Sequence, residues 1–392
     1  MRLIETPEQR AFRAEARAFM ETHLTDEVHR RVLATGTIHD WGFHRALGER
    51  GWIGLNWATP EGSGPAHEED PLMAAILYEE AHRAWAPMYG INTTMGAANA
   101  LIRCAAPDLR DEVLPRVRRG EVIIALGFSE PHSGSDIALA KTTITPTDGG
   151  WLVNGQKVFT SLAEEAEYIF LVGRTSEGAR KNDGLTTLLV PTRSPGLDVT
   201  PLYTVAERTN VTYYNDVFVP DHYRIGAPER GWDVLRVALS IERGGKGFHG
   251  HLLRLLDDLL RALPEGGSGF RGEERLPEAF LEDLGRAVTE AEVARLLDYR
   301  TAAISARGGL PMVEGSMAKL FSSESLTTLV TAFIDHLGAA GLLPMGHRGA
   351  IADGWIEYLH RFAIPTTVYG GVAEVQRSLV AEHRLGLPRS RA

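Results

Sequence analysis

The chain has 392 residues, of which 44% are hydrophobic and 23% charged, as is typical of a globular protein with two or three domains. Its formal net charge of −10 argues against nucleic acid or an anionic membrane as the main partner, because both bind clustered lysine and arginine. The single cysteine excludes an intrachain disulfide and a cysteine-based zinc cluster. No signal peptide and no run of about 18 apolar residues is visible, so we expect a cytoplasmic protein without a membrane span.

The first third of the chain has the spacing of helices. Thr6 is placed to cap a helix, with Pro7 at its first position and Gln9 completing a capping box. Apolar residues at helical intervals predict further helices, over 40–50, 70–85, 91–105 and 108–118. Residues 1–121 are therefore predicted to form an N-terminal helical domain.

The pattern changes to short apolar segments at residue 122. Segments rich in β-branched and aromatic residues predict strands over 122–128, Lys141–Thr145, Trp151–Val153, Val158–Thr160, Tyr168–Val172, Leu185–Val190 and Val211–Val219. Turn signals separate them, including Asp148-Gly149-Gly150 and Asn154-Gly155, and the second matches a type I′ hairpin. Strands at this spacing predict a small β-barrel or β-sandwich domain over residues 122–229.

Helical spacing returns at Trp232. It predicts long amphipathic helices over 232–262, 277–306 and 315–341 and a last one beginning near Ala373, which together form a C-terminal helical domain over 230–392. Gly266-Gly-Ser-Gly269 is interpreted as a loop. Gly245-Lys-Gly-Phe-His-Gly250 fits a dinucleotide-binding motif by letter but lacks a preceding strand, so we interpret its glycines as sites of close helix packing. The predicted fold class is α+β, mainly α.

Three stretches contain the residues that point to a function. They are Gly127-Phe-Ser-Glu-Pro-His-Ser-Gly-Ser-Asp136 after a strand, Asn154-Gly-Gln-Lys-Val-Phe-Thr-Ser161, and Tyr369-Gly-Gly-Val-Ala-Glu-Val-Gln-Arg377 leading into Arg384-Leu-Gly-Leu-Pro-Arg389. The first offers small residues, hydroxyls and backbone N–H groups, which suit a pyrophosphate or the edge of a ring, although an ordinary turn has the same composition.

In this order the stretches resemble the acyl-CoA dehydrogenase superfamily, and the resemblance covers nearly the whole chain. Further matching segments are the Thr-Pro-Glu-Gln start, Gly51-Trp-Ile-Gly-Leu-Asn-Trp57, Val219-Pro-Asp, Arg224-Ile-Gly, Gly231-Trp and Leu239-Ser-Ile-Glu-Arg243. The resemblance implies an N-terminal helical domain, a β-domain and a C-terminal four-helix bundle. It also implies FAD as the cofactor, bound between the β-domain and the helical domains.

The resemblance assigns the cofactor contacts residue by residue. Leu126, Phe128 and Ser129 are expected beside the flavin, and Gly134 and Ser135 near the pyrophosphate and the pantetheine arm of the substrate. Phe159 is expected to pack on the flavin ring, where Trp is common in the family, and Ser161 to bond near flavin N5. The remaining expected FAD contacts are Gly338, Gly341, Val372 and Glu374. An Arg-x-x-Phe-Gly motif that often holds the adenosine in this family is absent from residues 265–275.

The reaction of the family removes a proton α to a thioester carbonyl and passes the β-hydrogen to the flavin. The commonest position of its glutamate base follows the tyrosine matched by Tyr369, and here that residue is Gly370. Some branches place the base before an arginine on the helix after the β-domain, which corresponds here to Glu242 and Arg243. We therefore expect Glu242 to be the base and the Gly370 N–H to bond the thioester oxygen, with Arg243 and Tyr369 near the substrate. An ion pair or a cap is the alternative role for Glu242.

The expected reaction is α,β-dehydrogenation of an acyl thioester, on CoA or a carrier protein, in fatty acid or lipid metabolism. Reoxidation by an electron-transfer flavoprotein or equivalent is implied, as is a homodimer or homotetramer, with a heterotetramer as the alternative. Because Gly370 lacks a carboxylate, two alternative functions stay open. One is a flavin-dependent monooxygenase or oxidase, and the other is a weakly active subunit of a heteromeric dehydrogenase. A non-catalytic scaffold is a third alternative.

Overall fold

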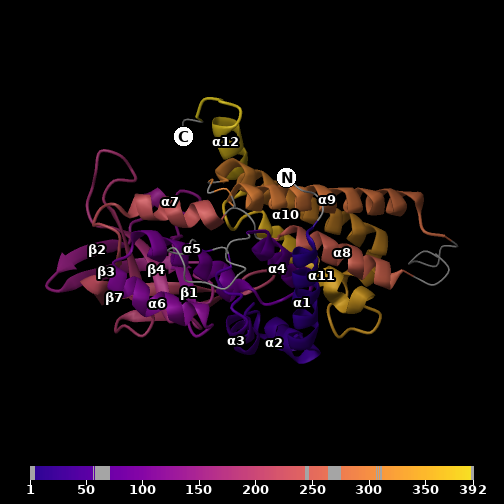
Figure 1. The fold of residues 1–392 in the computed structure, drawn as a ribbon, viewed down its shortest axis with the longest axis horizontal. Coiled ribbons are helices and arrows are strands. Elements are labelled where there is room, and N and C mark those ends of the chain that lie inside the picture. Colours follow the sequence, from indigo (N-terminus) through magenta and orange to yellow (C-terminus); the bar gives the residue numbers. More distant parts are fainter. Residues whose placement is uncertain are drawn as a thin grey trace. The chain divides into compact units, whose positions relative to one another are not determined.

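The computed structural model describes residues 5–55, 57, 71–242, 247–263, 275–305, 307, 309 and 311–389, except for the side chains of residues 71 and 240–242 (Figure 1). The chain forms two compact units. We call residues 1–24, 71–86 and 243–392 the helical unit, and residues 25–70 and 87–242 the sheet unit. The expected loop over 266–269 and most of the segment 265–275 lie outside the described residues.

The sheet unit contains the strands and the helices that pack on them. In chain order its helices are α2 (Asp26–Thr35), α3 (Trp41–Glu49), α5 (Tyr89–Cys104), α6 (Pro107–Arg118) and α7 (Gly231–Glu242), with short 3₁₀ turns η1 (Ile137–Leu139) and η2 (Asp221–Tyr223). Its strands are β1 (Ile124–Gly127), β2 (Thr143–Thr147), β3 (Gly150–Val158), β4 (Tyr168–Arg174), β5 (Leu185–Pro191), β6 (Leu197–Tyr203), β7 (Arg208–Pro220) and β8 (Arg224–Ile225).

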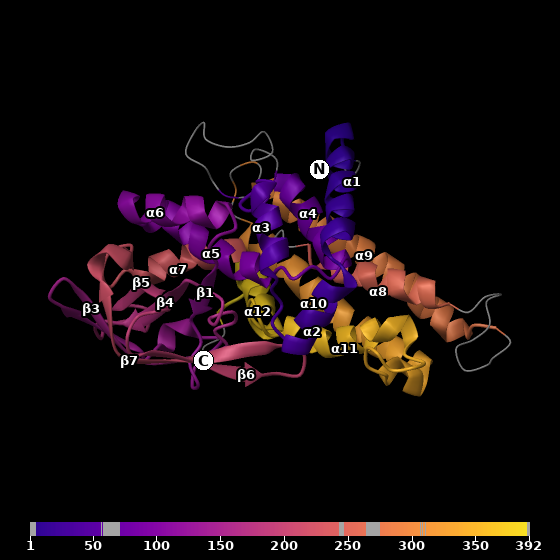
Figure 2. The ribbon, with the colours of Figure 1, turned by 90° about the horizontal axis from the view of Figure 1, so that it is seen from below.

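The strands form one eight-stranded sheet in the described part of the chain. Its order is β6-β7-β3-β2-β4-β5-β8, and β1 pairs in parallel with β4. Strands β4 and β5 are buried along nearly their whole length, because α5 packs on β1 and α7 on β5 (Figure 2). A hydrophobic core of this unit packs Ile169, Leu171, Leu188 and Val190 together with residues of β3 and β7.

The predicted hairpin at Asn154-Gly155 is wrong. Residues 150–158 form the single strand β3, which pairs with β7 from Gly150↔Pro220 to Val158↔Val211 and has a bulge between Val153 and Gly155. Gly155 has a φ of +149°, and a Cβ there would lie 2.6 Å from Thr142 Oγ1, so the glycine serves a close approach within the sheet. The predicted turn at Asp148-Gly149 is confirmed, since it joins β2 to β3.

The helical unit gathers helices from three separate parts of the chain. They are α1 (Pro7–His23), α4 (Pro71–Arg83), α8 (His249–Ala262), α9 (Glu278–Ser305), α10 (Met312–Leu337), α11 (Trp355–Thr366) and α12 (Ala373–His383), with the short turns η4 (Gly338–Leu342) and η5 (Ile351–Gly354). The predicted capping box of Thr6 and Gln9 is present at the start of α1, with Pro7 in the first turn. The long helix predicted over 232–262 is instead two helices, α7 and α8.

Helix α10 lies at the centre of the helical unit, where it packs on α8, α9, α11 and α12. By length and composition the stretch Met312–Leu342 could cross a membrane, with a mean hydropathy of 1.2. Core helices of globular proteins pass the same test, and α10 buries the polar side chains of Ser316, Lys319 and Ser323 among other helices. We therefore interpret α10 as a core helix.

Glycines allow α8 to approach α4 closely. A Cβ at Gly247 would lie 2.5 Å from the Glu79 nitrogen, and a Cβ at Gly250 would lie 2.5 Å from the Glu79 oxygen. Both distances are too short for any side chain. The interpretation of these glycines as sites of close helix packing is thus confirmed for Gly247 and Gly250, whereas residues 244–246 lie outside the described residues.

Candidate active site

The segment after β1 begins inside the core and ends at the surface. Leu126 is half-buried on β1, and Phe128 is buried with its ring 5.3 Å from that of Phe170. The carbonyl of Ser129 accepts a hydrogen bond of 2.9 Å from the N–H of Val158. The backbone from 126 to 129 is therefore fixed between two strands before the chain leaves the sheet.

A buried ion pair holds the next residues. Lys157 is fully buried, and its Nζ lies 2.7 Å from Glu130 Oε1 and donates to the Phe128 carbonyl at 3.2 Å. Glu130 also accepts hydrogen bonds from the backbone N–H groups of Lys141 and Thr142, at 2.8 and 2.9 Å. Burial lowers the pKa of Lys157 to about 8, although the Glu130 carboxylate opposes this shift. Removing one partner would leave the other charge buried, so the pair fixes the segment against the strands.

Within this fixed segment, Gly134 and Ser135 are exposed. A Cβ added at Gly134 would meet no described atom within 4 Å, so internal packing does not require a glycine at this position. A glycine that internal packing does not require is typical of a position where a bound molecule comes close to the backbone.

Phe159 is a bulky residue in an unfavourable conformation. It directly follows β3, has a φ of +57° and leaves 59% of its surface exposed. The left-handed region disfavours large side chains, and such strain persists only where neighbours impose it. Here the N–H of Thr160 donates to the Asn210 carbonyl at 2.9 Å, and Ser161 Oγ lies 2.9 Å from Thr209 Oγ1. These bonds hold an exposed aromatic ring beside a half-buried hydroxyl.

Glu242 is the last residue of α7. The helix is anchored by the buried residues Val234, Leu235 and Ala238, and Gly96 of α5 lies beside it, since a Cβ there would be 3.6 Å from the Ala238 oxygen. The side chain of Glu242 and the whole of Arg243 lie outside the described residues. Their roles stay predictions.

The helical unit supplies the loop that contains Tyr369 and Gly370. Tyr369 is half-buried, with its ring 6.4 Å from the ring of Phe248. Gly370 has a φ of +66° and Gly371 a φ of +93°, and a Cβ at Gly370 would meet no described atom within 4 Å. The N–H of Gly370 donates no hydrogen bond to a described residue. Backbone conformation, and not lack of space, is thus the reason for a glycine here.

Two buried side chains hold this loop by its carbonyl groups. Lys319 Nζ donates to the carbonyls of Thr367 and Gly371, at 3.2 and 2.8 Å. Gln376 is fully buried, and its Nε2 donates to the carbonyls of Gly370 and Gly371, at 2.9 and 3.2 Å. With its carbonyls bound from the inside, the loop keeps the Gly370 N–H available as a donor.

Replacing Gly370 with alanine should lower the free energy of unfolding by about 1–2 kcal/mol. The reason is the left-handed conformation, which costs this much for a residue with a Cβ, and steric overlap adds nothing. Urea unfolding monitored by circular dichroism measures the change. Alanine at Gly134, where φ is not positive and no atom lies near, is the matched control and should change stability by under about 0.5 kcal/mol.

The other predicted cofactor residues are also on the helical unit. Gly338 ends α10 with a φ of +62° and Gly341 is buried, with the position of its Cβ only 2.8 Å from Leu337 Cβ. Val372 precedes α12 and is half-buried, and Glu374 is exposed in the first turn of that helix. All four residues belong to the helical unit.

A second buried cluster of charges lies at Gly247 and His249, at the start of α8. The His249 ring is fully buried, with Nε2 2.8 Å from Glu79 Oε2 and Nδ1 3.1 Å from Asp298 Oδ2. Asp298 also accepts the N–H of Gly247 at 2.6 Å. Burial lowers the pKa of His249, but the bonds to Asp298 and Glu79 and their charges raise it to about 9. The His249 ring holds the Asp298 carboxylate, and this carboxylate holds the backbone N–H of Gly247, five residues after Glu242.

Sequence reasoning missed these buried charged and polar side chains. Glu130 and Lys157 lie within two of the quoted motifs, and their opposite charges inside those motifs were the available signal. For Lys319, Gln376 and His249 no local signal exists, because the partners that bury them are far away in the sequence.

The described residues fit an FAD. A flavin needs a planar surface to stack on, hydroxyls at its edge and a backbone that its pyrophosphate can approach, and on the sheet unit Phe159, Ser161 and Gly134 have these properties. No group of three or more metal-binding side chains occurs among the residues with described positions.

Comparison with known proteins agrees with this site. The N-terminal, middle and C-terminal domains of acyl-CoA dehydrogenases match residues 6–121, 125–215 and 229–385. "Acyl-CoA dehydrogenase FadE26" of Mycobacterium tuberculosis is 31% identical over the full length of both chains. Among solved structures, the ChsE4-ChsE5 complex from the same organism matches with a TM-score of 0.88 and 30% identity, over all of both chains. A structure titled "Tcur3481-Tcur3483 steroid ACAD" matches equally well in TM-score, at 29% identity and full coverage.

The three domain matches cover most of the chain, and their order agrees with the helical, β and helical order along the sequence. The residues suited to a flavin lie within the matched regions. The chain belongs to the acyl-CoA dehydrogenase family of FAD-dependent oxidoreductases.

Proposed function

We propose that this enzyme introduces a double bond between the α- and β-carbons of an acyl-CoA, with Glu242 as the base. The observation that carries the proposal is the loop at Gly370. In this chain Gly370 occupies the position at which the family usually has its glutamate base. Its φ of +66° disfavours a glutamate, and its N–H donates to no described residue. The donor is retained and the carboxylate must come from elsewhere.

In this proposal each group has one role. The Glu242 carboxylate removes the α-proton, and the Gly370 N–H donates to the thioester oxygen as negative charge develops on it. Bound FAD supplies an acceptor for the β-hydrogen as a hydride. Lys319 and Gln376 hold the carbonyls of the Gly370 loop, so the donor does not reorganise when charge develops.

The residues proposed to hold the FAD on the sheet unit are Leu126, Phe128, Ser129, Phe159 and Ser161. Their positions depend on the Glu130–Lys157 pair, which fixes the segment around Phe128. Gly134 and Ser135 are proposed to approach the pyrophosphate, and Ser135 also the pantetheine arm. On the other unit, Gly338, Gly341, Val372 and Glu374 are proposed FAD contacts, with Tyr369 and Arg243 near the substrate.

Replacing Phe159 with alanine should weaken FAD binding about fivefold, since stacking of one aromatic ring contributes roughly 1 kcal/mol beyond buried area. The apoprotein should keep its stability to within about 1 kcal/mol, because the side chain is 59% exposed and its conformation strained. Equilibrium dialysis against FAD and denaturant unfolding measure the two effects. Phe218 on β7, which is also exposed, at 44%, provides the control.

The titles of two solved relatives support a proposal about the acyl group and the assembly. The solved relatives include one titled a complex of ChsE4 with ChsE5 and one titled a steroid ACAD with two named components. We propose that this chain acts on a bulky acyl-CoA, as a homodimer or homotetramer or with a related chain, and passes its electrons to an electron-transfer flavoprotein. Sedimentation of the protein alone and mixed with candidate related dehydrogenase chains distinguishes these assemblies.

The glycine at position 370 also favours a second candidate, a weakly active subunit that needs a competent partner. This candidate predicts that the isolated, FAD-loaded chain leaves its flavin oxidised when mixed anaerobically with acyl-CoAs, and that a partner chain restores the reduction. The proposed dehydrogenase reduces its flavin without a partner chain, and only with Glu242 intact.

A further inference from the structure

Two hydroxyl groups of the sheet unit form a pair whose members differ in exposure. Ser161 Oγ, three residues after the end of β3, lies 2.9 Å from Oγ1 of Thr209, the second residue of β7. Ser161 is half-buried, whereas Thr209 is only 1% exposed. A bound molecule can therefore contact the serine hydroxyl directly, and the threonine hydroxyl can act on that molecule only through the serine.

Burial decides the direction of the hydrogen bond within this pair. Each hydroxyl has one hydrogen to donate, and neither side chain has another hydrogen-bond partner among the described residues. If Ser161 donated to Thr209, the Thr209 hydrogen would be buried without an acceptor, and an unsatisfied buried donor is costly. If Thr209 donates, its hydrogen is bonded and the Ser161 hydrogen turns to the exposed side, where water or a ligand accepts it. Thr209 is therefore the donor.

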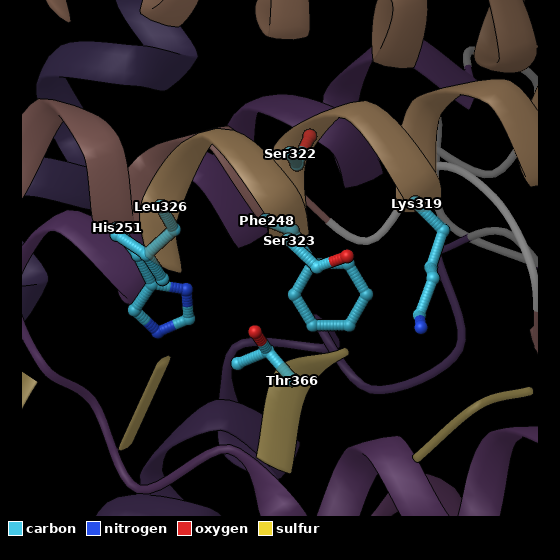
Figure 3. A pocket seen from close by; sticks show the side chains of 7 residues that line it. All are labelled: Phe248, His251, Lys319, Ser322, Ser323, Leu326 and Thr366. Carbon is cyan, nitrogen blue, oxygen red and sulfur yellow. The ribbon is translucent and has the colours of Figure 1, made fainter. Parts of the chain in front are cut away.

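Several other buried hydroxyls in the described part of the chain bond differently. Ser323 and Thr366, which line a small pocket of the helical unit (Figure 3), donate to the carbonyls of Leu320 and Ala363 in their own helices. Their hydrogens are used on the backbone of the helix. Ser161 donates to no described carbonyl, so its hydrogen serves a group that is not part of the described chain.

Strand β7 also fixes the backbone around the serine. The N–H of Thr160 donates to the Asn210 carbonyl at 2.9 Å, and Asn210 Nδ2 donates to the Thr160 carbonyl at 3.1 Å. Both residues are fully buried. Phe159 and Leu162, on either side, have φ angles of +57° and +63°, which large side chains adopt only where their neighbours impose them. The serine is thus held in one place, and the threonine on β7 sets the direction of its hydroxyl.

We propose that Thr209 is a positioning residue that directs the Ser161 hydroxyl as a hydrogen-bond donor to nitrogen N5 of bound FAD. This inference rests on the proposed function, in which Ser161 contacts the flavin. N5 of an oxidised flavin carries a lone pair and no hydrogen, so the outward hydrogen of Ser161 matches it. Because a hydroxyl that accepts a hydrogen bond becomes a stronger donor, loss of the Thr209 hydroxyl weakens the bond from Ser161 and also frees its direction.

Equilibrium dialysis of the full-length apoprotein against FAD and against 5-deaza-FAD tests this role. The two cofactors have nearly the same shape, but 5-deaza-FAD has a C–H group in place of N5 and accepts no hydrogen bond there. We expect the wild type to bind FAD about fivefold more tightly than 5-deaza-FAD, which is the contribution of one neutral hydrogen bond. Thr209→Val should reduce this preference to about twofold or less. Ser161→Ala should abolish the preference, and Thr209→Ser should retain it.

Thr212→Val is the matched control. Thr212 is fully buried on the same strand, and its hydroxyl donates to Tyr214 Oη at 3.2 Å. A structural effect of removing a buried hydroxyl from β7 changes the binding of both cofactors equally, so Thr212→Val should keep the wild-type preference for FAD. If Thr209→Val does not fold, Thr209→Ala also removes the hydroxyl and takes its place.

Equal binding of the two cofactors by the wild type would overturn the inference, as would a wild-type preference in Thr209→Val or Thr209→Ala. A preference that survives Ser161→Ala would show that another group bonds N5, and it would overturn the inference too. Because the dialysis contains no substrate, its outcome is separate from that of the dehydrogenase reaction. A flavin that no acyl-CoA reduces would contradict the proposed function, and the ratio of the two cofactor affinities would still decide the role of Thr209.

Discussion

Glu242→Gln should lower the rate of flavin reduction by an acyl-CoA about a thousandfold, which is within the range that a positioned general base contributes. Glutamine has nearly the same size and cannot accept the α-proton. FAD content and the midpoint of thermal unfolding should stay at wild-type values, because the buried residues that anchor α7, namely Val234, Leu235 and Ala238, are unchanged. Single-turnover mixing without oxygen measures the rate free of reoxidation.

A matched control distinguishes a catalytic role of Glu242 from a general effect of removing a carboxylate from α7. Asp233→Asn removes a carboxylate from the first turn of the same helix and should change the rate by less than threefold. Glu242→Asp should retain part of the activity, since it keeps a carboxylate on a shorter chain. A Glu242→Gln enzyme with the wild-type rate of flavin reduction would show that another group is the base.

Replacing His249 with glutamine should lower the free energy of unfolding by about 3 kcal/mol or more at pH 6. The substitution removes the positive charge between Glu79 and Asp298, whose side chains are only 5% and 7% exposed. Buried charges that lose their partner are destabilising by roughly 3–5 kcal/mol. Arg13 also contacts Glu79, at 2.5 Å, and limits the loss at that carboxylate.

The same pair of proteins should differ in how stability depends on pH. The pKa of His249 is raised from 6.5 to about 9, so the folded state binds a proton that the unfolded state releases between these values. Its contribution is complete below pH 6.5 and is lost as the pH rises through 9. The stability gap between wild type and His249→Gln should therefore narrow from pH 6 to pH 9.5, when urea unfolding is measured at both. A gap that stays constant would mean that His249 is not charged in the folded protein.

His336→Gln is the control for this experiment. His336 pairs with Asp283 at 2.9 Å on the same unit, but both side chains are more exposed, at 20% and 26%. Partly exposed pairs contribute about 1 kcal/mol or less. The control should therefore lose much less stability than His249→Gln.

Much of the fold could be predicted from the sequence. The helices over α3, α4, α5, α6, α9 and α10 match the spacing of their apolar residues, and most strands match short β-branched segments. Strand β6 was missed because only alternate residues are partly buried and Pro201 interrupts its pattern. Helix α11 was missed because Pro365 lies near its end, and the hairpin at Asn154-Gly155 was wrong because the long strand β7 continues past that point and converts a turn signal into a bulge.

The candidate site was predictable to a different extent. Motif order indicated the family, and from the family came the flavin residues and the choice of Glu242. The sequence did not explain why residue 370 is a glycine. The explanation is its φ of +66°, in a loop whose carbonyls are held by Lys319 and Gln376. The same holds for His249, whose carboxylates come from positions 79 and 298. Burial of charge depends on residues that only folding brings together.

The central claim is that this chain oxidises acyl-CoAs with Glu242 as the base. The most direct measurement mixes the yellow, FAD-loaded protein anaerobically with a panel of saturated acyl-CoAs that includes bulky and ring-containing acyl groups, in wild-type and Glu242→Gln forms. We predict loss of the oxidised flavin absorbance in the wild type with at least one acyl-CoA, together with the α,β-unsaturated product, and no loss on that timescale in the variant. Oxidised flavin with every acyl-CoA, or equal bleaching in both proteins, would contradict the claim.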